Sequence, residues 1–192
     1  MCLLIAGLAI FFGAHSIAVV LPRLRDSLRA RWGEGAWKAA YSIISLIGFV
    51  LICKGFVLAR LSPTMLYAPP AWLRYVAAVL MVPVFPLVFA SFLPGRIRTA
   101  MKQPLLAGVK FWALAHLLAN GGLADVLLFG SFLAWAVIDR ISFKRRPPQV
   151  LRTAPLRPWN DAAALVLGLA VYAIFLFGAH RWLFGVAPLG SY

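Results

Sequence analysis

The chain is a succession of apolar blocks, each about twenty residues long, separated by short segments that carry most of its charge. A helix of about that length crosses the hydrocarbon core of a bilayer. Hydrophobic residues make up 63% of the 192 positions and charged residues 12%, which is about half the charged fraction of a soluble domain. The sequence therefore predicts an all-α, polytopic transmembrane helical bundle whose first partner is the lipid bilayer.

The apolar blocks predict about six membrane spans, with ends marked by prolines, glycine pairs and clusters of basic residues. In chain order, the expected spans cover about residues 2–20, 37–59, 71–93, 105–119, 123–138 and 161–184. The first block has no basic leader and no small-residue cleavage site, so it is expected to be a retained span. With no repeat and no soluble segment between the blocks, residues 1–192 are expected to form a single membrane domain.

The basic residues alternate between the connecting segments. Nearly all basic residues of the connecting segments lie in three of them, namely Pro22–Ala36, Pro94–Pro104 and Asp139–Asp161. The other two segments, Arg60–Pro70 and Asn120–Gly122, together contain only Arg60. The positive-inside rule then makes 139–161 a basic cytoplasmic loop and places both termini on the other side, in the periplasm for a bacterial inner membrane. This topology accounts for the net charge of +14, so no nucleic-acid partner is expected.

Prolines and glycines predict where the helices break. Pro83 and Pro86 are expected to kink the third span. Asn120-Gly121-Gly122 has the composition of a tight turn between the fourth and fifth spans. Asn160 or Asp161 is expected to cap the sixth span.

Small residues predict where helices approach one another closely. Ser42, Ser45 and Gly48 form a stripe on the second span, and Gly13-Ala14 offers a second small surface on the first. Both features are typical of helix–helix contacts in membranes.

Ionisable groups inside a membrane are costly and mark functional sites. The candidates are His15, His116, His180 and Lys110. His15 lies about 10 Å and His116 about 18 Å from the cytoplasmic ends of their spans, so both are expected near mid-membrane. His180 lies near the opposite surface and is expected to be an interfacial residue beside Arg181.

Two histidines at similar depth on different helices could be the axial ligands of one haem. Phe11, Phe12 and Trp112 lie close to them in sequence and would suit the porphyrin faces. In the alternative, each imidazole donates a hydrogen bond to a carbonyl or a serine on a neighbouring helix. The residues alone leave both interpretations open.

The helix of His116 carries the other candidate cofactor contacts. Gly108, Trp112, His116 and Asn120 recur at every fourth position and so share one face. Lys110 lies away from this face and could extend to the cytoplasmic surface or bind a haem propionate. Trp112, Asn120 and Lys110 are therefore the predicted cofactor contacts, and His15 and His116 are the predicted metal ligands.

Four segments carry a resemblance to a known family, namely Phe11–Ser16, Pro69–Arg74, Gly108–Gly121 and Leu128–Arg140. With them the chain resembles the NnrU family of bacterial integral membrane proteins, over nearly its whole length up to Arg146. The resemblance implies a multi-pass protein of the bacterial inner membrane. It also implies a link to denitrification, because members are associated with the expression or function of nitrite and nitric oxide reductases.

The family is also similar to the plant and cyanobacterial 15-cis-zeta-carotene isomerases, which carry haem b in a helical membrane core. Their histidine ligands would fall on His15 and His116. Gln103 stands where relatives often carry histidine, so no role is transferred to it. A cysteine that exchanges with the ligand in the isomerases would fall near Ala113, so ligand switching is not transferred either.

Together, residues and resemblance predict a haem b protein with an accessory or regulatory role in denitrification, working beside other membrane proteins of nitrogen-oxide respiration. The first alternative is a haem-dependent isomerase of a lipid-phase polyene. The second is a cofactor-free membrane transporter or scaffold. Whether the protein is an enzyme is left open.

Overall fold

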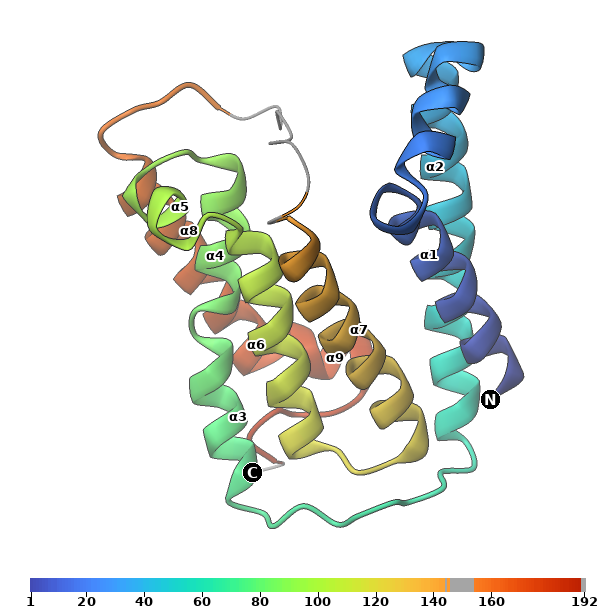
Figure 1. The fold of residues 1–192 in the computed structure, drawn as a ribbon. Helices are drawn as coiled ribbons and strands as arrows, with labels where there is room; N and C mark the ends of the chain where they lie inside the picture. The colour runs from blue at the N-terminus through green and yellow to red at the C-terminus, as the bar shows by residue number, and fades with distance from the viewer. Residues whose placement is uncertain (144, 146–153, 191–192) are drawn as a thin grey trace. The chain divides into compact units, whose positions relative to one another are not determined.

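The computed structural model describes residues 1–143, 145 and 154–190 (Figure 1). These residues form helices and connecting segments, and their only β-type pairing is an isolated bridge between Met65 and Gly122. The helices are α1 (Cys2–Val20), α2 (Pro22–Arg60), α3 (Leu73–Met81), α4 (Val84–Phe92), α5 (Arg96–Met101), α6 (Pro104–Ala119), α7 (Leu123–Ser142), α8 (Asn160–Ile174), the π-helix η1 (Phe175–Ala179) and α9 (His180–Phe184). The all-α prediction is confirmed.

Three helical stretches in the described chain are long and apolar enough to cross a membrane, namely Pro22–Arg60, Leu73–Phe92 and Asn160–Phe184. Cys2–Ile17 and Pro104–Ala119 are shorter apolar helices. With α7, the architecture is that of a membrane-type helical protein with three to six spans.

The chain divides into two compact units. The first consists of Met1–Leu66 with Gly122–Ser131, and the second of Tyr67–Gly121 with the residues from Phe132 onward. Helix α7 begins in the first unit and continues in the second. The single membrane domain expected over residues 1–192 stays a prediction.

In the first unit, glycines bring α1 and α2 into backbone contact. A methyl group on Gly48 would lie 2.8 Å from the backbone nitrogen of Phe11, and one on Gly7 would lie 2.6 Å from that of Ile52. Such close approach is how membrane helices gain packing energy without a hydrophobic driving force between them. The predicted helix contact is confirmed at Gly48, although Ser42 of the same stripe is exposed. In the Gly13-Ala14 pair, Ala14 is buried, but no atom lies within 4 Å of the would-be side chain of Gly13, so the expectation was wrong at Gly13.

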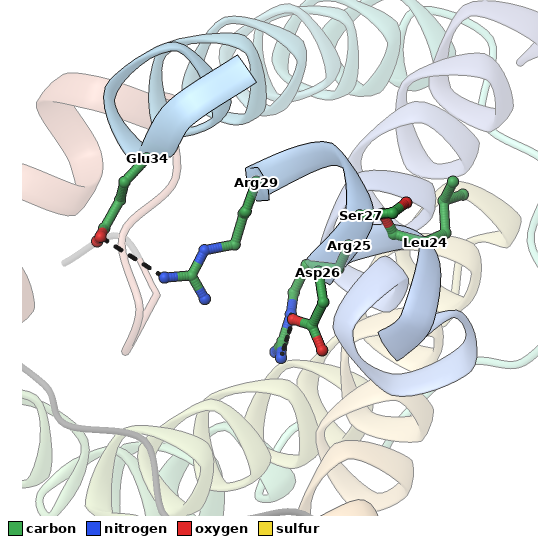
Figure 2. A network of polar contacts seen from close by, with 6 residues as sticks. All are labelled: Leu24, Arg25, Asp26, Ser27, Arg29 and Glu34. Atoms are coloured by element: carbon green, nitrogen blue, oxygen red, sulfur yellow. Dashed lines mark hydrogen bonds and ion pairs between the residues drawn. The ribbon is translucent and has the colours of Figure 1, made fainter. Parts of the chain in front are cut away.

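Pro22–Ala36 was expected to be a loop and is helical instead. Pro22 is the first residue of α2, where a proline needs no amide hydrogen, and the helix is interrupted at Gly33, whose φ of 78° suits only glycine. Glu34 lies next to this break, 3.6 Å from Arg29 on the preceding turn (Figure 2) and 2.6 Å from Lys38 on the following one. Arg25 and Asp26 form another ion pair (Figure 2), at 2.8 Å. Of these pairs, only Glu34–Lys38 has the i,i+4 spacing that stabilises a helix.

In the second unit, α6 packs against α3 and α4, and α4 packs against α8. The predicted break at Pro83 is confirmed, because α3 ends at Met81 and α4 begins at Val84. Pro86 lies in the first turn of α4 and does not break it. Its ring instead contacts the position where Gly168 of α8 lacks a side chain. Gly108 similarly faces the Val84 carbonyl, at 3.2 Å from its would-be methyl group.

Asn160 and Asp161 do not cap α8 as expected. The Asp161 carboxylate accepts hydrogen bonds from the backbone amides of Arg96 at 2.8 Å and Ile97 at 3.1 Å, and so caps α5. Asn160 donates to the carbonyls of Pro94 at 2.8 Å and Pro155 at 3.0 Å. The unpaired amides at the start of α5 need an acceptor, and the beginning of α8 supplies it.

The predicted turn at Asn120-Gly121-Gly122 is an extended segment. Asn120 has φ −134° and ψ 129°, and the Gly121 carbonyl accepts a hydrogen bond from the Tyr67 amide at 3.2 Å. A side chain on Gly121 would collide with the Tyr67 carbonyl, so the glycine is needed for this backbone contact.

The basic segment Asp139–Asp161 also differs from its prediction at its beginning. Helix α7 continues to Ser142, so Asp139 and Arg140 are helical, and Asp139 is buried. Of the basic residues expected in this loop, Lys144, Arg146 and Arg152 lie outside the described residues. Its cytoplasmic location stays a prediction.

Replacing Gly48 with alanine tests the α1–α2 contact. The added methyl group would overlap backbone rather than a movable side chain, so Gly48→Ala should cost about 1–3 kcal/mol and lower the yield of folded protein in mild detergent. The matched change Gly13→Ala should leave the yield unchanged or raise it, because alanine favours a helix by about 1 kcal/mol over glycine. Equal losses in the two variants, measured by size-exclusion chromatography, would contradict the contact.

Topology can be tested with reporter fusions to the two ends of α6. Arg96, Arg98 and Lys102 precede this helix, whereas Asn120 and the two glycines follow it. By the positive-inside rule, a fusion after Arg98 should report cytoplasm and a fusion at Gly122 should report periplasm. The opposite pattern of alkaline phosphatase and fluorescent-protein signals would overturn the orientation.

Candidate functional site

His15 is fixed on α1 by the residue one turn before it. Its Nδ1 atom lies 2.8 Å from the Phe11 carbonyl oxygen, and its ring stacks on the Phe11 ring with 4.0 Å between centroids. The Tyr41 ring of α2 lies 5.3 Å away. His15 therefore sits in an aromatic setting in the first unit.

His116 repeats this arrangement on α6. Its Nδ1 atom lies 2.8 Å from the Trp112 carbonyl oxygen, and the two rings are 5.4 Å apart. Trp112 in turn packs edge-on against Phe132, with 5.4 Å between centroids. Because α6 ends at Ala119, His116 occupies the last turn of its helix.

These contacts assign the tautomer of both imidazoles. A carbonyl oxygen can only accept a hydrogen bond, so Nδ1 must carry the proton in each ring. The lone pair of each neutral ring is then on Nε2, which is the atom that can bind a metal. Metal-binding histidines usually donate their other nitrogen to a carbonyl or carboxylate in this way.

His180 was expected to be an interfacial residue beside Arg181, and its depth in the membrane stays a prediction, but its proximity to His116 was not predicted. Its ring lies 6.4 Å from the His116 ring, at an interplanar angle of 27°, and its Nδ1 atom lies 2.6 Å from the Val186 carbonyl oxygen. The π-helix η1 directly precedes it, and the wider turn of a π-helix changes which face the next residues present.

The two histidines line a cavity of about 350 Å³ in the second unit. Its other polar lining residues are Arg74, Asn120 and Tyr172. Its walls are apolar and include Met81, Phe85 and Phe175, and the rings of the last two lie 5.2 Å apart. The wall near Arg74 also includes Val186, Ala187, Pro188 and Gly190.

The predicted cofactor contacts occupy different places around His116. Asn120 lines the cavity and donates from Nδ2 to the His116 carbonyl at 2.9 Å. Trp112 supports the His116 ring, as described above. Lys110 is half-buried and is not among the residues lining this cavity. Among the described residues, no group of three or more His, Cys, Asp or Glu side chains is close enough to hold a metal ion.

Sequence reasoning missed Arg74, Tyr172 and Tyr67. Tyr172 donates its hydroxyl to the Ala78 carbonyl at 2.9 Å, which joins α8 to α3. Tyr67 contacts two carbonyls at the end of α6, that of Leu117 and, at 2.7 Å, that of Asn120. Arg74 is the last residue of the Pro69–Arg74 motif, so this motif was the feature of the sequence that could have pointed to Arg74 as a site residue.

These features define a helical, membrane-type protein with a histidine-lined cavity at the end of one apolar helix. The family model described as NnrU protein matches residues 3–188, and the chain therefore belongs to the NnrU family. The match continues past Arg146, where the resemblance was expected to fade, and includes His180. No curated protein and no solved structure matches the chain.

Removing the Tyr67 hydroxyl tests how the end of α6 is held. Tyr67→Phe leaves two terminal carbonyls of α6 without this donor and should cost about 1 kcal/mol, seen as a lower Tm in detergent. The control is Tyr75→Phe, at a tyrosine that is 54% exposed, and it should leave the Tm unchanged. An unchanged Tm in both variants would show that the Tyr67 contact contributes nothing to stability.

Proposed function

We propose that this NnrU-family protein binds haem b through His15 and His116 and has an accessory role in denitrification. The single observation that carries the proposal is the shared geometry of the two imidazoles. Each donates Nδ1–H over 2.8 Å to the carbonyl of an aromatic residue four positions earlier. Each ring is therefore held in place, with its Nε2 lone pair suited to an iron ligand.

The donor set fits haem better than a small metal ion. Imidazole is a common axial ligand of haem iron, and a haem needs only two protein ligands. No cluster of three or more ligating side chains occurs in the described chain, as a protein-bound zinc site would require. Phe11 and Trp112, which pack against the two imidazoles, are also the kind of side chain that porphyrin faces contact.

The chain's own residues would set the properties of the bound group. Trp112 and Phe11 orient the imidazoles, and their carbonyls make Nε2 more basic by accepting the Nδ1 protons. When bound, haem would supply a redox-active iron whose behaviour depends on these ligands and on the polarity around it. The link to nitrite and nitric oxide metabolism comes from the resemblance to the family and is part of the proposal.

The test is an optical spectrum of the protein purified from haem-replete cells, with three histidine variants. His15→Ala and His116→Ala should each remove most of the Soret absorbance, and the double variant should add little, because loss of either ligand already breaks the site. His180→Ala should retain the haem. The folded state of each variant is checked by its elution profile.

Three results would contradict this proposal. A colourless parent protein would favour a transporter or scaffold without a cofactor. Haem that survives both single substitutions would show that neither histidine is needed. Loss of haem in His180→Ala but not in His15→Ala would make His116 and His180 the ligand pair.

A further inference from the structure

Arg74 is a charged side chain in an apolar part of the second unit. It is the second residue of α3, within the apolar stretch Leu73–Phe92 that is long enough to cross a membrane. An arginine near the end of a membrane helix usually extends its charged group to the interface, so its surroundings decide what it does. The structure shows what surrounds its guanidinium group.

The Arg74 guanidinium has a donor that the described chain does not satisfy. Its Nε atom is buried and has no hydrogen-bond partner among the described residues. No ion pair joins Arg74 to an acidic group in that part of the chain either. Its carbon Cζ lies 5.3 Å from the Tyr75 ring centroid, and its Nη1 atom lies against Gly190, which has a φ of 93°. A buried donor of this kind needs an acceptor, and a charged one more so.

The cavity beside Arg74 lacks an acceptor of opposite charge. Arg74 is the only Arg, Lys, Asp or Glu among the described residues that line it. Tyr172 and the Nδ1 atoms of His116 and His180 already donate to backbone carbonyls. The remaining walls are apolar, and the volume of about 350 Å³ is at the lower end for a ligand pocket. None of the described residues therefore supplies an anion to Arg74, and an anionic ligand would satisfy it.

The residues around this cavity favour a ligand with a carboxylate group attached to a hydrocarbon chain. A guanidinium group matches a planar carboxylate with two parallel hydrogen bonds. One positive charge neutralises one carboxylate, whereas a phosphate of nearly two negative charges would need further donors. A pure hydrocarbon would leave the Arg74 donor buried without a partner, so the apolar walls alone do not describe the ligand.

We propose that this cavity binds a lipid-phase carboxylic acid, of the free fatty acid type, with Arg74 as the counter-ion of its carboxylate. The chain of the acid would lie against Met81, Phe85 and Phe175. His180 and Asn120 would lie beside the head group as polar neighbours. This site does not rest on the haem proposal, because Arg74 and the cavity belong wholly to the second unit.

The test compares a fatty acid with its own methyl ester. The full chain is placed in phosphatidylcholine nanodiscs with palmitic acid that carries a photoreactive diazirine on its chain, or with the ester of that molecule. Labelled residues are identified by mass spectrometry after irradiation. The acid should label Met81, Phe85 or Phe175 about tenfold more than the ester, since only the acid pairs with the guanidinium.

Variants of Arg74 make the test specific. Arg74→Gln should lower labelling by the acid to the level of the ester, and Arg74→Lys should keep part of it, because charge remains without the planar pair of donors. The matched control is Arg181→Gln, at an exposed arginine that does not line the cavity. This variant should leave labelling by the acid unchanged. Labelling by the ester reports whether each variant is folded.

Several outcomes would overturn the fatty-acid site. These are equal labelling by acid and ester in the parent protein, and unchanged acid labelling in Arg74→Gln. Loss of acid labelling with excess inorganic phosphate would indicate a site for small anions. Absence of acid labelling together with loss of the Soret band in Arg74→Gln would assign Arg74 to a haem propionate. Because labelling needs no haem spectrum, this proposal and the haem proposal can fail separately.

Discussion

The helices of this protein depend on hydrogen bonds that the chain must make with itself. In an apolar environment no water satisfies backbone or imidazole groups, so a polar group either finds an internal partner or weakens the fold. His15 and His116 meet this requirement with the carbonyl four residues earlier, which their own helix presents to them. That bond orients each ring and places its proton on Nδ1.

Irregular backbone then places the polar groups of the second unit together. The break at Pro83 separates α3 from α4, and the extended segment at Asn120 ends α6 one turn after His116. The π-helix η1 precedes His180 and gives its ring a different direction from that of a continuous α-helix. Each interruption lies beside the cavity or leads into it, as expected for membrane proteins, in which irregular backbone must line a cavity or be covered by protein.

Features that depend on local pattern could be predicted from the sequence. The bounds of α1, the break at Pro83 and the close contact at Gly48 all follow from hydropathy, proline chemistry and small residues. The helix at Pro22–Ala36 was missed because charged residues were taken as a sign of a loop. There, ion pairs on either side of Gly33 make a charged segment compatible with a helix.

Features that depend on residues distant in sequence could not be predicted in the same way. Asp161 caps a helix that begins 65 residues earlier, and no spacing rule connects them. The proximity of His116 and His180 depends on the packing of separate helices and on a π-helix that hydropathy does not reveal. The aromatic neighbours of His15 and His116, by contrast, were visible, because a four-residue spacing on a helix implies contact.

A comparison of Arg60 with Arg74 shows why topology alone does not explain Arg74. The positive-inside rule accounts for basic residues in the odd-numbered connecting segments, but Arg60 and Arg74 flank the second segment, where such residues are depleted. In the first unit, the guanidinium carbon of Arg60 lies 5.7 Å from the centroid of the Phe56 ring. Arg74 has the aromatic neighbour but no acidic one among the described residues. Arg74 differs from Arg60 in that its Nε atom is buried without a hydrogen-bond partner among the described residues, and an external carboxylate would supply the acceptor.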